Sequence, residues 1–195
     1  MPLKELKFEE LEGVLNLKIV ESNMMIVGSS RIRVLIVEMN KKFRKDLAKR
    51  LNQFGYKTFE AENSTDTERI IKQKKIDVVV LGINRFGRGG LSILEMIGEK
   101  SPSAKVILLN DSENIFLSIA GMKLGAFDDL LLPVDLEALR KRIEDAYQKK
   151  KKEQKAKLSL SRRCQDLMVA ATFAEAGDDK TALEILRNKK RRNNR

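Results

Sequence analysis

Short apolar runs alternate with amphipathic stretches through the middle of the chain. The first amphipathic stretch, Asn40–Phe54, has apolar residues every three or four positions and stops before Gly55, as a helix with a glycine C-cap does. Comparable stretches predict further helices at Asn63–Ile71, Leu91–Glu99, Ser112–Leu124 and Asp135–Tyr147. The apolar runs predict strands, because short β-rich runs are typical of strands buried in a sheet. These runs are Ile32–Val37, Tyr56–Ala61, Asp77–Ile83, Ala104–Leu109 and Asp128–Leu132.

This repeated strand–helix order predicts an α/β fold with a parallel sheet covered on both faces. The common solution is a flavodoxin-like, doubly wound five-stranded sheet in the order 2-1-3-4-5. Ligands of such sheets bind outside the carboxyl ends of the strands. The residues expected at that edge are Glu38, Met39, Gly82, Asn110, Asp111 and Leu132.

Over Arg31–Lys150 the sequence resembles the receiver domain of bacterial response regulators, the CheY-like family. The resemblance lies in VLIVE at Val34–Glu38, DVVVLGI at Asp77–Ile83, KVILLND at Lys105–Asp111 and LGAFDDLLLPVDLEAL at Leu124–Leu139. It implies a two-component signalling role, in which a phosphoryl group is moved onto an aspartate beside Mg²⁺. The reaction needs oxygen ligands for the metal, a lysine to neutralise the phosphoryl oxygens and a hydroxyl to hydrogen-bond one of them.

The residues at these positions depart from the family pattern. Glu38 matches the first acidic position. The other positions hold Met39 for the second acid, Gly82 for the phosphoacceptor aspartate, Asn110 for the hydroxyl residue, Leu132 for the lysine and Asp129 for the aromatic switch residue. Glycine cannot form an acyl phosphate, and a methionine thioether is a poor Mg²⁺ ligand. We therefore predict a degenerate receiver, or pseudo-receiver, with no catalytic residue, metal or cofactor. Asp111 could approach the pocket, but it lies one position beyond the expected strand end, where strand alternation favours the other face.

Composition removes other chemistries. The chain has no histidine, which excludes histidine general bases and histidine-ligated metals, and its one cysteine, Cys164, excludes an internal disulfide. We expect Cys164 to be a buried or inert helical thiol. The glycine-rich run Gly82–Gly90 lacks the spacing of a phosphate-binding loop and is interpreted as a mobile loop. No apolar run approaches the roughly 20 residues of a membrane span, so we expect a cytoplasmic protein without membrane contact.

Charge is concentrated near the end of the chain. The net charge of +11 includes 15 basic and 6 acidic residues within positions 148–195. We expect three parts: residues 1–30 as an N-terminal extension or a start assigned too early, residues 31–148 as the receiver-like domain, and residues 149–195 as a basic helical extension. The extension is predicted to hold a helical hairpin with its turn at Gly177–Asp179, and a disordered tail.

Two functions remain open at this point. The first is a signalling adaptor that binds protein partners without phosphorylation, or self-associates as a homodimer, through a face containing Phe116, Asp129 and Arg140. Apolar residues near this face include Ile119, which we expect to belong to the core. The second is a nucleic-acid-associated regulator that uses the basic C-terminal segment.

Overall fold

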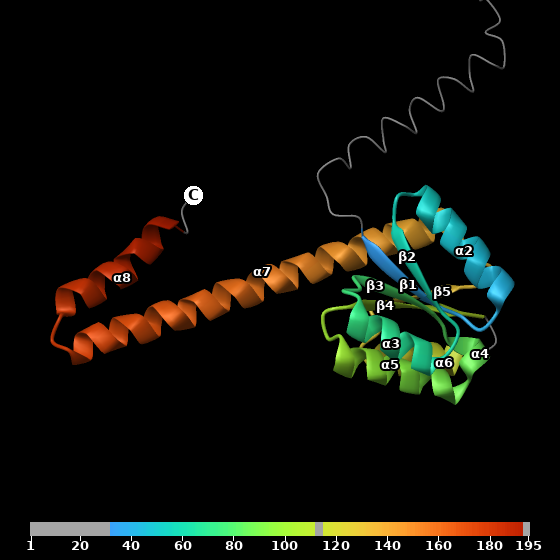
Figure 1. Cartoon of the computed structure of the whole chain (residues 1–195), viewed down its shortest axis with the longest axis horizontal. Helices are drawn as coiled ribbons and strands as arrows, with labels where there is room; N and C mark the ends of the chain where they lie inside the picture. Colours follow the sequence, from blue (N-terminus) through green and yellow to red (C-terminus); the bar gives the residue numbers. More distant parts are fainter. Residues whose placement is uncertain (1–31, 112–114, 193–195) are drawn as a thin grey trace, which may run out of the picture. The chain divides into compact units, whose positions relative to one another are not determined.

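A parallel sheet forms the centre of the first structural unit. The computed structural model describes residues 32–111 and 115–192, with side chains through residue 186. Its five strands lie in the order β2-β1-β3-β4-β5, which confirms the predicted flavodoxin-like topology (Figure 1). The strands are β1 Arg33–Val37, β2 Lys57–Ala61, β3 Val78–Gly82, β4 Lys105–Asn110 and β5 Asp128–Leu131.

Helices cover both faces of this sheet, and each face has its own apolar core. On one face, Leu35 and Leu81 pack with residues of α3 (Ser64–Gln73) and α5 (Arg88–Lys100). On the other face, Val34 and Ile36 pack with α2 (Lys41–Gln53) and with the first turns of α7 (Leu136–Glu175). Because successive strand residues point to opposite faces, β1 supplies both cores, which explains its unbroken apolar sequence. The remaining helices are α4 Ile83–Phe86, α6 Ile115–Lys123 and α8 Asp179–Arg192.

The glycine-rich run after β3 is helical, so its interpretation as a mobile loop is wrong. It forms α4 and the start of α5, joined at Gly87, whose φ of +53° suits glycine. At Gly90, an added Cβ would lie 2.8 Å from both the Cγ1 and the carbonyl oxygen of Ile83. Glycine at position 90 therefore allows the start of α5 to approach α4 closely.

The chain divides between Tyr147 and Gln148 into two compact units. Helix α7 is one 40-residue helix that crosses this division. It continues past Tyr147, as the absence of proline and glycine before Gly177 allows. Cys164 is exposed on α7, so the part of the prediction that buried it is wrong. Within the described residues, no helix is both long enough and apolar enough to span a membrane. The predicted N-terminal extension, the residues Ser112–Asn114 and the end of the tail lie outside the described part of the chain.

Candidate functional site

The carboxyl edge of the sheet contains a small polar cavity. Val37 of β1 pairs with Leu81 of β3, and this register brings the next residues, Glu38 and Gly82, to the same place at the edge. The cavity has a volume of about 310 Å³. Its lining residues are Glu38, Gly82, Asn84, Arg85, Leu109, Asp111 and Leu132. The position agrees with the rule that open α/β sheets bind ligands at their carboxyl edge.

The carboxylate of Glu38 lies directly against Gly82. Glu38 is only 3% exposed. Its Oε1 accepts a hydrogen bond of 2.7 Å from the backbone N–H of Asn40 and lies 3.4 Å from Nε of Arg85. A Cβ added to Gly82 would collide with Oε2 of Glu38. Glu38 therefore takes up the space into which a side chain at position 82 would project, and Arg85 compensates its charge.

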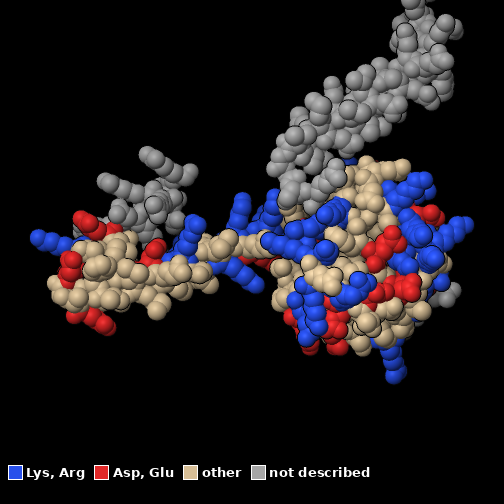
Figure 2. All heavy atoms as spheres, in the orientation of Figure 1, with Lys and Arg blue, Asp and Glu red and all other residues tan. Residues whose placement is uncertain are grey.

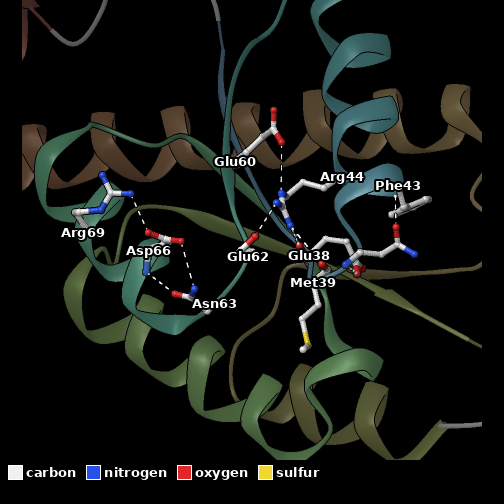
Figure 3. A network of polar contacts seen from close by, with 10 residues as sticks. Glu38, Met39, Phe43, Arg44, Glu60, Glu62, Asn63, Asp66 and Arg69 are labelled. Atoms are coloured by element: carbon white, nitrogen blue, oxygen red, sulfur yellow. Dashed lines mark hydrogen bonds and ion pairs between the residues drawn. The ribbon is translucent and has the colours of Figure 1, made fainter.

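Arg44 of α2 holds the segment that follows β1 (Figure 3). Its buried guanidinium donates hydrogen bonds to the backbone carbonyls of Glu38 and Met39. The same group donates to Glu62 at 3.0 Å and approaches Glu60 at 3.4 Å. One arginine thus ties the end of β1 to the end of β2. Sequence reasoning missed Arg44; the two glutamates around the end of β2 were the available signal for a cation between these strands.

Only some of the other predicted pocket residues line the cavity. The Met39 side chain is 52% exposed, and Asn110 is fully buried, so neither lines the cavity. Leu132 is half-buried and does line it. Asp111 also lines the cavity, although strand alternation favoured the opposite orientation. This expectation was wrong because β4 ends at Asn110 and the alternation stops there.

Two residues of α4 complete the cavity, and sequence reasoning did not place them there. Asn84 and Arg85 lie in the run Gly82–Gly90, whose sequence was examined only as a phosphate-binding loop or a mobile loop. Both side-chain amide atoms of Asn84 are buried and have no hydrogen-bond partner within the described part of the chain. Buried amides are nearly always hydrogen-bonded, so Asn84 marks this edge as incompletely satisfied.

These residues do not fit a magnesium centre. Mg²⁺ requires near-octahedral oxygen ligands, whereas the buried carboxylate here is paired with a guanidinium and the methionine of the loop points into solvent. Across the described residues, no three acidic, histidine or cysteine side chains form a group that could hold a metal ion. The cavity offers the carboxylates of Glu38 and Asp111, an amide and an arginine. These groups bind and orient, but they include no nucleophile on β3.

A second candidate surface lies on α6 and β5. Phe116 is 87% exposed and Ile119 is 50% exposed, so the assignment of Ile119 to the core is wrong. The hydroxyl of Ser118 donates a hydrogen bond to Asp129, which joins the helix to β5. Arg140, the third predicted member of this face, contacts other residues. Its guanidinium lies 5.6 Å from the centroid of the Phe54 ring and pairs with Glu137 at 3.0 Å.

Comparisons with known proteins agree with the fold. Residues 34–144 match the family model described as the response regulator receiver domain. The transcriptional regulatory protein GlrR of Escherichia coli K12 is 29% identical over 115 residues, which are 59% of this chain and 26% of that protein. The photosynthetic apparatus regulatory protein RegA of Rhodobacter capsulatus is 27% identical over 59% of this chain and 62% of its own length. A receiver domain structure from Clostridium thermocellum matches with a TM-score of 0.58 and 28% identity, over 62% of this chain and 97% of the other.

Proposed function

Because the chain belongs to the response regulator receiver domain family, we propose that it is a signalling adaptor that acts by protein contact and without phosphorylation. The observation that carries this proposal is the position of the Glu38 carboxylate, which lies against Gly82 and pairs with Arg85. In the resemblance described above, that space belongs to the phosphoacceptor side chain. The matched region of GlrR is about a quarter of that protein, 26%, so the output of the present chain is itself part of the proposal.

The charge state of the pocket supports a receiver that stays in one conformation. Two or more adjacent carboxylates repel one another, and a bound cation relieves that repulsion. Here Glu38 already has an arginine counter-ion at 3.4 Å and a backbone N–H donor at 2.7 Å. A ligand shifts a conformational equilibrium only by its differential affinity for the two states. Because the charge of Glu38 is already compensated, a ligand at this site has little differential affinity for two conformations. The proposal therefore assigns the receiver one fixed conformation.

Partner binding is assigned to the α6–β5 surface, defined by Ile115, Phe116, Ile119 and Asp129. Its apolar side chains are at least half exposed, with Ile115 at 62% and Phe116 at 87%. The Ser118–Asp129 hydrogen bond fixes the helix against the strand. Exposed aromatic and aliphatic side chains on a rigid support are typical anchors of protein interfaces.

Intact-mass measurement tests the phosphorylation claim. The full chain is incubated with acetyl phosphate and Mg²⁺, beside a receiver that carries aspartate at the position of Gly82. We expect a mass gain in the second protein only. A gain in this chain that hydroxylamine removes would contradict the proposal, because it would reveal an acyl phosphate at another carboxylate of the pocket.

Affinity capture from an extract of the native cell tests the surface. We expect Phe116→Ala combined with Ile119→Asp to abolish capture while thermal unfolding stays cooperative. Arg140→Glu examines whether α7 belongs to the interface; because Arg140 contacts Phe54 and Glu137, we expect a smaller effect from it. The surface assignment fails if the Phe116 and Ile119 variant captures the same partners as the original chain.

The basic segment supports an alternative function in nucleic-acid binding. Figure 2 shows Lys and Arg side chains gathered along α7. Lys150 is buried, so the exposed cations of the run are Lys149, Lys152, Lys155 and Lys157. Contacts to phosphates release counterions, so DNA or RNA binding through this run would weaken steeply with salt. Binding that falls in Lys152→Glu combined with Lys155→Glu, and is unchanged in the Phe116 variant, would favour this alternative over the adaptor.

A further inference from the structure

The second unit, Gln148–Arg195, contains a helical hairpin. The C-terminal part of α7 is joined to α8 by a turn in which Gly177 has a φ of +80°. Asp178 caps α8, since its carboxylate accepts hydrogen bonds from the backbone N–H of Thr181 at 3.1 Å and from its hydroxyl at 2.6 Å. These bonds lower the pKa of Asp178 below its usual value. Gly177 therefore follows the end of α7, and Asp178 marks the beginning of α8.

An apolar groove runs between the two helices. It has a volume of about 480 Å³. Its apolar lining is Leu167, Ala170, Ala171 and Ala174 from α7, with Ala182, Leu183 and Leu186 from α8. Ala170 and Ala182 are buried, at 4% and 6% exposure, whereas Leu167 and Leu183 are about half exposed, at 51% and 50%. The alanines allow close helix packing, but two helices alone do not cover the leucines. A pair of helices generally needs a further layer to bury such a face.

A row of residues on α7, charged at both ends and apolar between them, indicates which partner covers the groove. Arg163, Leu167, Ala171 and Glu175 follow one another at intervals of four residues, so they form one ridge along the helix. The row is self-complementary about position 169, with a cation at one end, an anion at the other and apolar residues between them. If a second α7 lies antiparallel on this row, each Arg163 meets the Glu175 of the second copy, and each Leu167 meets the small Ala171.

The parallel arrangement is electrostatically unfavourable. It would bring together the two acidic tips of the hairpins, where Glu175, Asp178 and Asp179 are all exposed. Asp179 itself lines the groove. Like charges placed opposite each other disfavour an interface, and opposite charges fix its orientation. Two-fold symmetric interfaces use the same patch on both copies, which the Arg163–Glu175 row satisfies.

We propose that the hairpin groove is occupied by the hairpin of a second copy of this chain, in antiparallel orientation, to give a four-helix dimer. The interface is separate from the α6–β5 surface, so the two proposals succeed or fail independently. It assigns a role to the apolar residues of the second unit that the adaptor function does not use.

The oligomeric state of the full chain tests the proposal. Sedimentation analysis over a range of protein concentrations should show a monomer–dimer equilibrium. Leu167→Asp combined with Leu183→Asp should give a monomer at every concentration. The control is Val169→Asp, an exposed apolar residue of α7 outside the groove lining, and it should dimerise as the original chain does. A monomeric original chain, or a dimer that survives the groove variant, would overturn the proposal.

Charge reversal tests the orientation while leaving the apolar groove intact. Arg163→Glu and Glu175→Arg should each weaken the dimer by about tenfold, because each places like charges opposite one another. The combined variant should recover most of the original affinity, since the two charges are exchanged and remain complementary. If the combined variant loses dimer affinity by the product of the two single losses, the antiparallel pairing is contradicted.

The single native cysteine gives a second measure of orientation. In the antiparallel pairing about position 169, the two Cys164 residues are ten positions apart along the interface, about 15 Å at 1.5 Å per residue. A disulfide requires Cα atoms within roughly 7 Å. Mild oxidation should therefore leave the original chain uncrosslinked and should crosslink Ala174→Cys, whose new thiol lies opposite Cys164 of the second copy. Efficient crosslinking of the original chain would instead indicate the parallel dimer and overturn the proposal.

Discussion

The two ends of the β1–β3 strand pair each carry an arginine paired with a buried carboxylate, and they are built differently. At the amino end, Asp77 accepts hydrogen bonds from the backbone N–H, Nε and a terminal guanidinium nitrogen of Arg33, at 3.0, 2.9 and 3.1 Å. At the carboxyl end, the side-chain carboxylate of Glu38 has one described arginine contact, with Nε of Arg85 at 3.4 Å. The two carboxylate side chains are equally buried, at 5% and 4% exposure, whereas the arginines differ, at 30% for Arg33 and 58% for Arg85.

The difference separates a structural edge from the edge that carries the candidate site. Burying a carboxylate is costly unless hydrogen bonds compensate it. Arg33 supplies a bidentate contact in addition to its backbone N–H, and the hydrogen bond to Asp77 raises the pKa of Arg33. The carboxyl edge instead keeps a cavity, and the amide atoms of Asn84 there have no hydrogen-bond partner among the residues that the structure describes. Buried polar groups are hydrogen-bonded in the great majority of cases, so the two edges differ in how completely their polar groups are satisfied.

Removing the amino-end pair should have the largest effect. Asp77→Ala should lower the free energy of unfolding of the full chain by about 2–3 kcal/mol, because it removes several charge-assisted hydrogen bonds and leaves Arg33 partly buried without its partner. Urea denaturation followed by circular dichroism measures the change. Glu137→Ala, which breaks the exposed pair with Arg140, is the control and should change stability by less than about 0.5 kcal/mol. Equal losses in the two variants would remove the distinction between the edges.

The sheet itself could be predicted from sequence, whereas the Arg33–Asp77 pair at its amino end was not predicted. Runs such as VLIV and DVVVL combine β-propensity with burial on both faces, and their order fixes the topology. The carboxyl-edge cavity was predicted in position but not in its contacts. Glu38 and Gly82 were named, whereas the pairing with Arg85 depends on the direction in which α4 leaves β3, and no local pattern encodes that direction.

Helix α6 shows why the exposed face was assigned incorrectly in part. Its sequence, IFLSIAGMK, has apolar residues on every side, so no stripe identifies the buried face. The structure buries Ser118 and Gly121 instead of Ile119. A Cβ at Gly121 would collide with the side chain of Leu108, so Gly121 faces β4. Leu117 packs against the core, whereas Ile115, Phe116, Ile119 and Met122 are exposed. The contact surface thus follows from tertiary packing.

A methyl group at position 82 should have an intermediate effect. Gly82 has a φ of −75°, which any residue adopts, so Gly82→Ala brings no backbone strain. Its Cβ collides with the Glu38 carboxylate, and we expect a loss of about 1–2 kcal/mol from this overpacking. In a Glu38→Ala background the same substitution should be neutral or stabilising, because the obstructing group is absent and alanine restricts the unfolded chain.

The double-mutant cycle isolates this interaction. Urea denaturation of the original chain, both single variants and the combined variant gives the coupling free energy between positions 38 and 82. A coupling near zero would mean that the Glu38 side chain rotates away at no cost, and the space beside Gly82 would then be open to a ligand.

Loss of the Arg85 contact should have the smallest effect. Arg85 is more than half exposed and its Nε lies 3.4 Å from Glu38, so water and salt screen the pair. Arg85→Ala should lower the free energy of unfolding by less than about 1 kcal/mol, and the loss should shrink further at about 1 M salt, where the Debye length is only about 3 Å. Arg88→Ala, an exposed arginine one turn along at the start of α5, is the matched control and should have no measurable effect. Arg85→Ala and Asp77→Ala could instead lower the free energy of unfolding equally. In that case the arginine at the carboxyl edge stabilises the fold as much as the one at the amino edge, and the compensation of the Glu38 charge depends on Arg85.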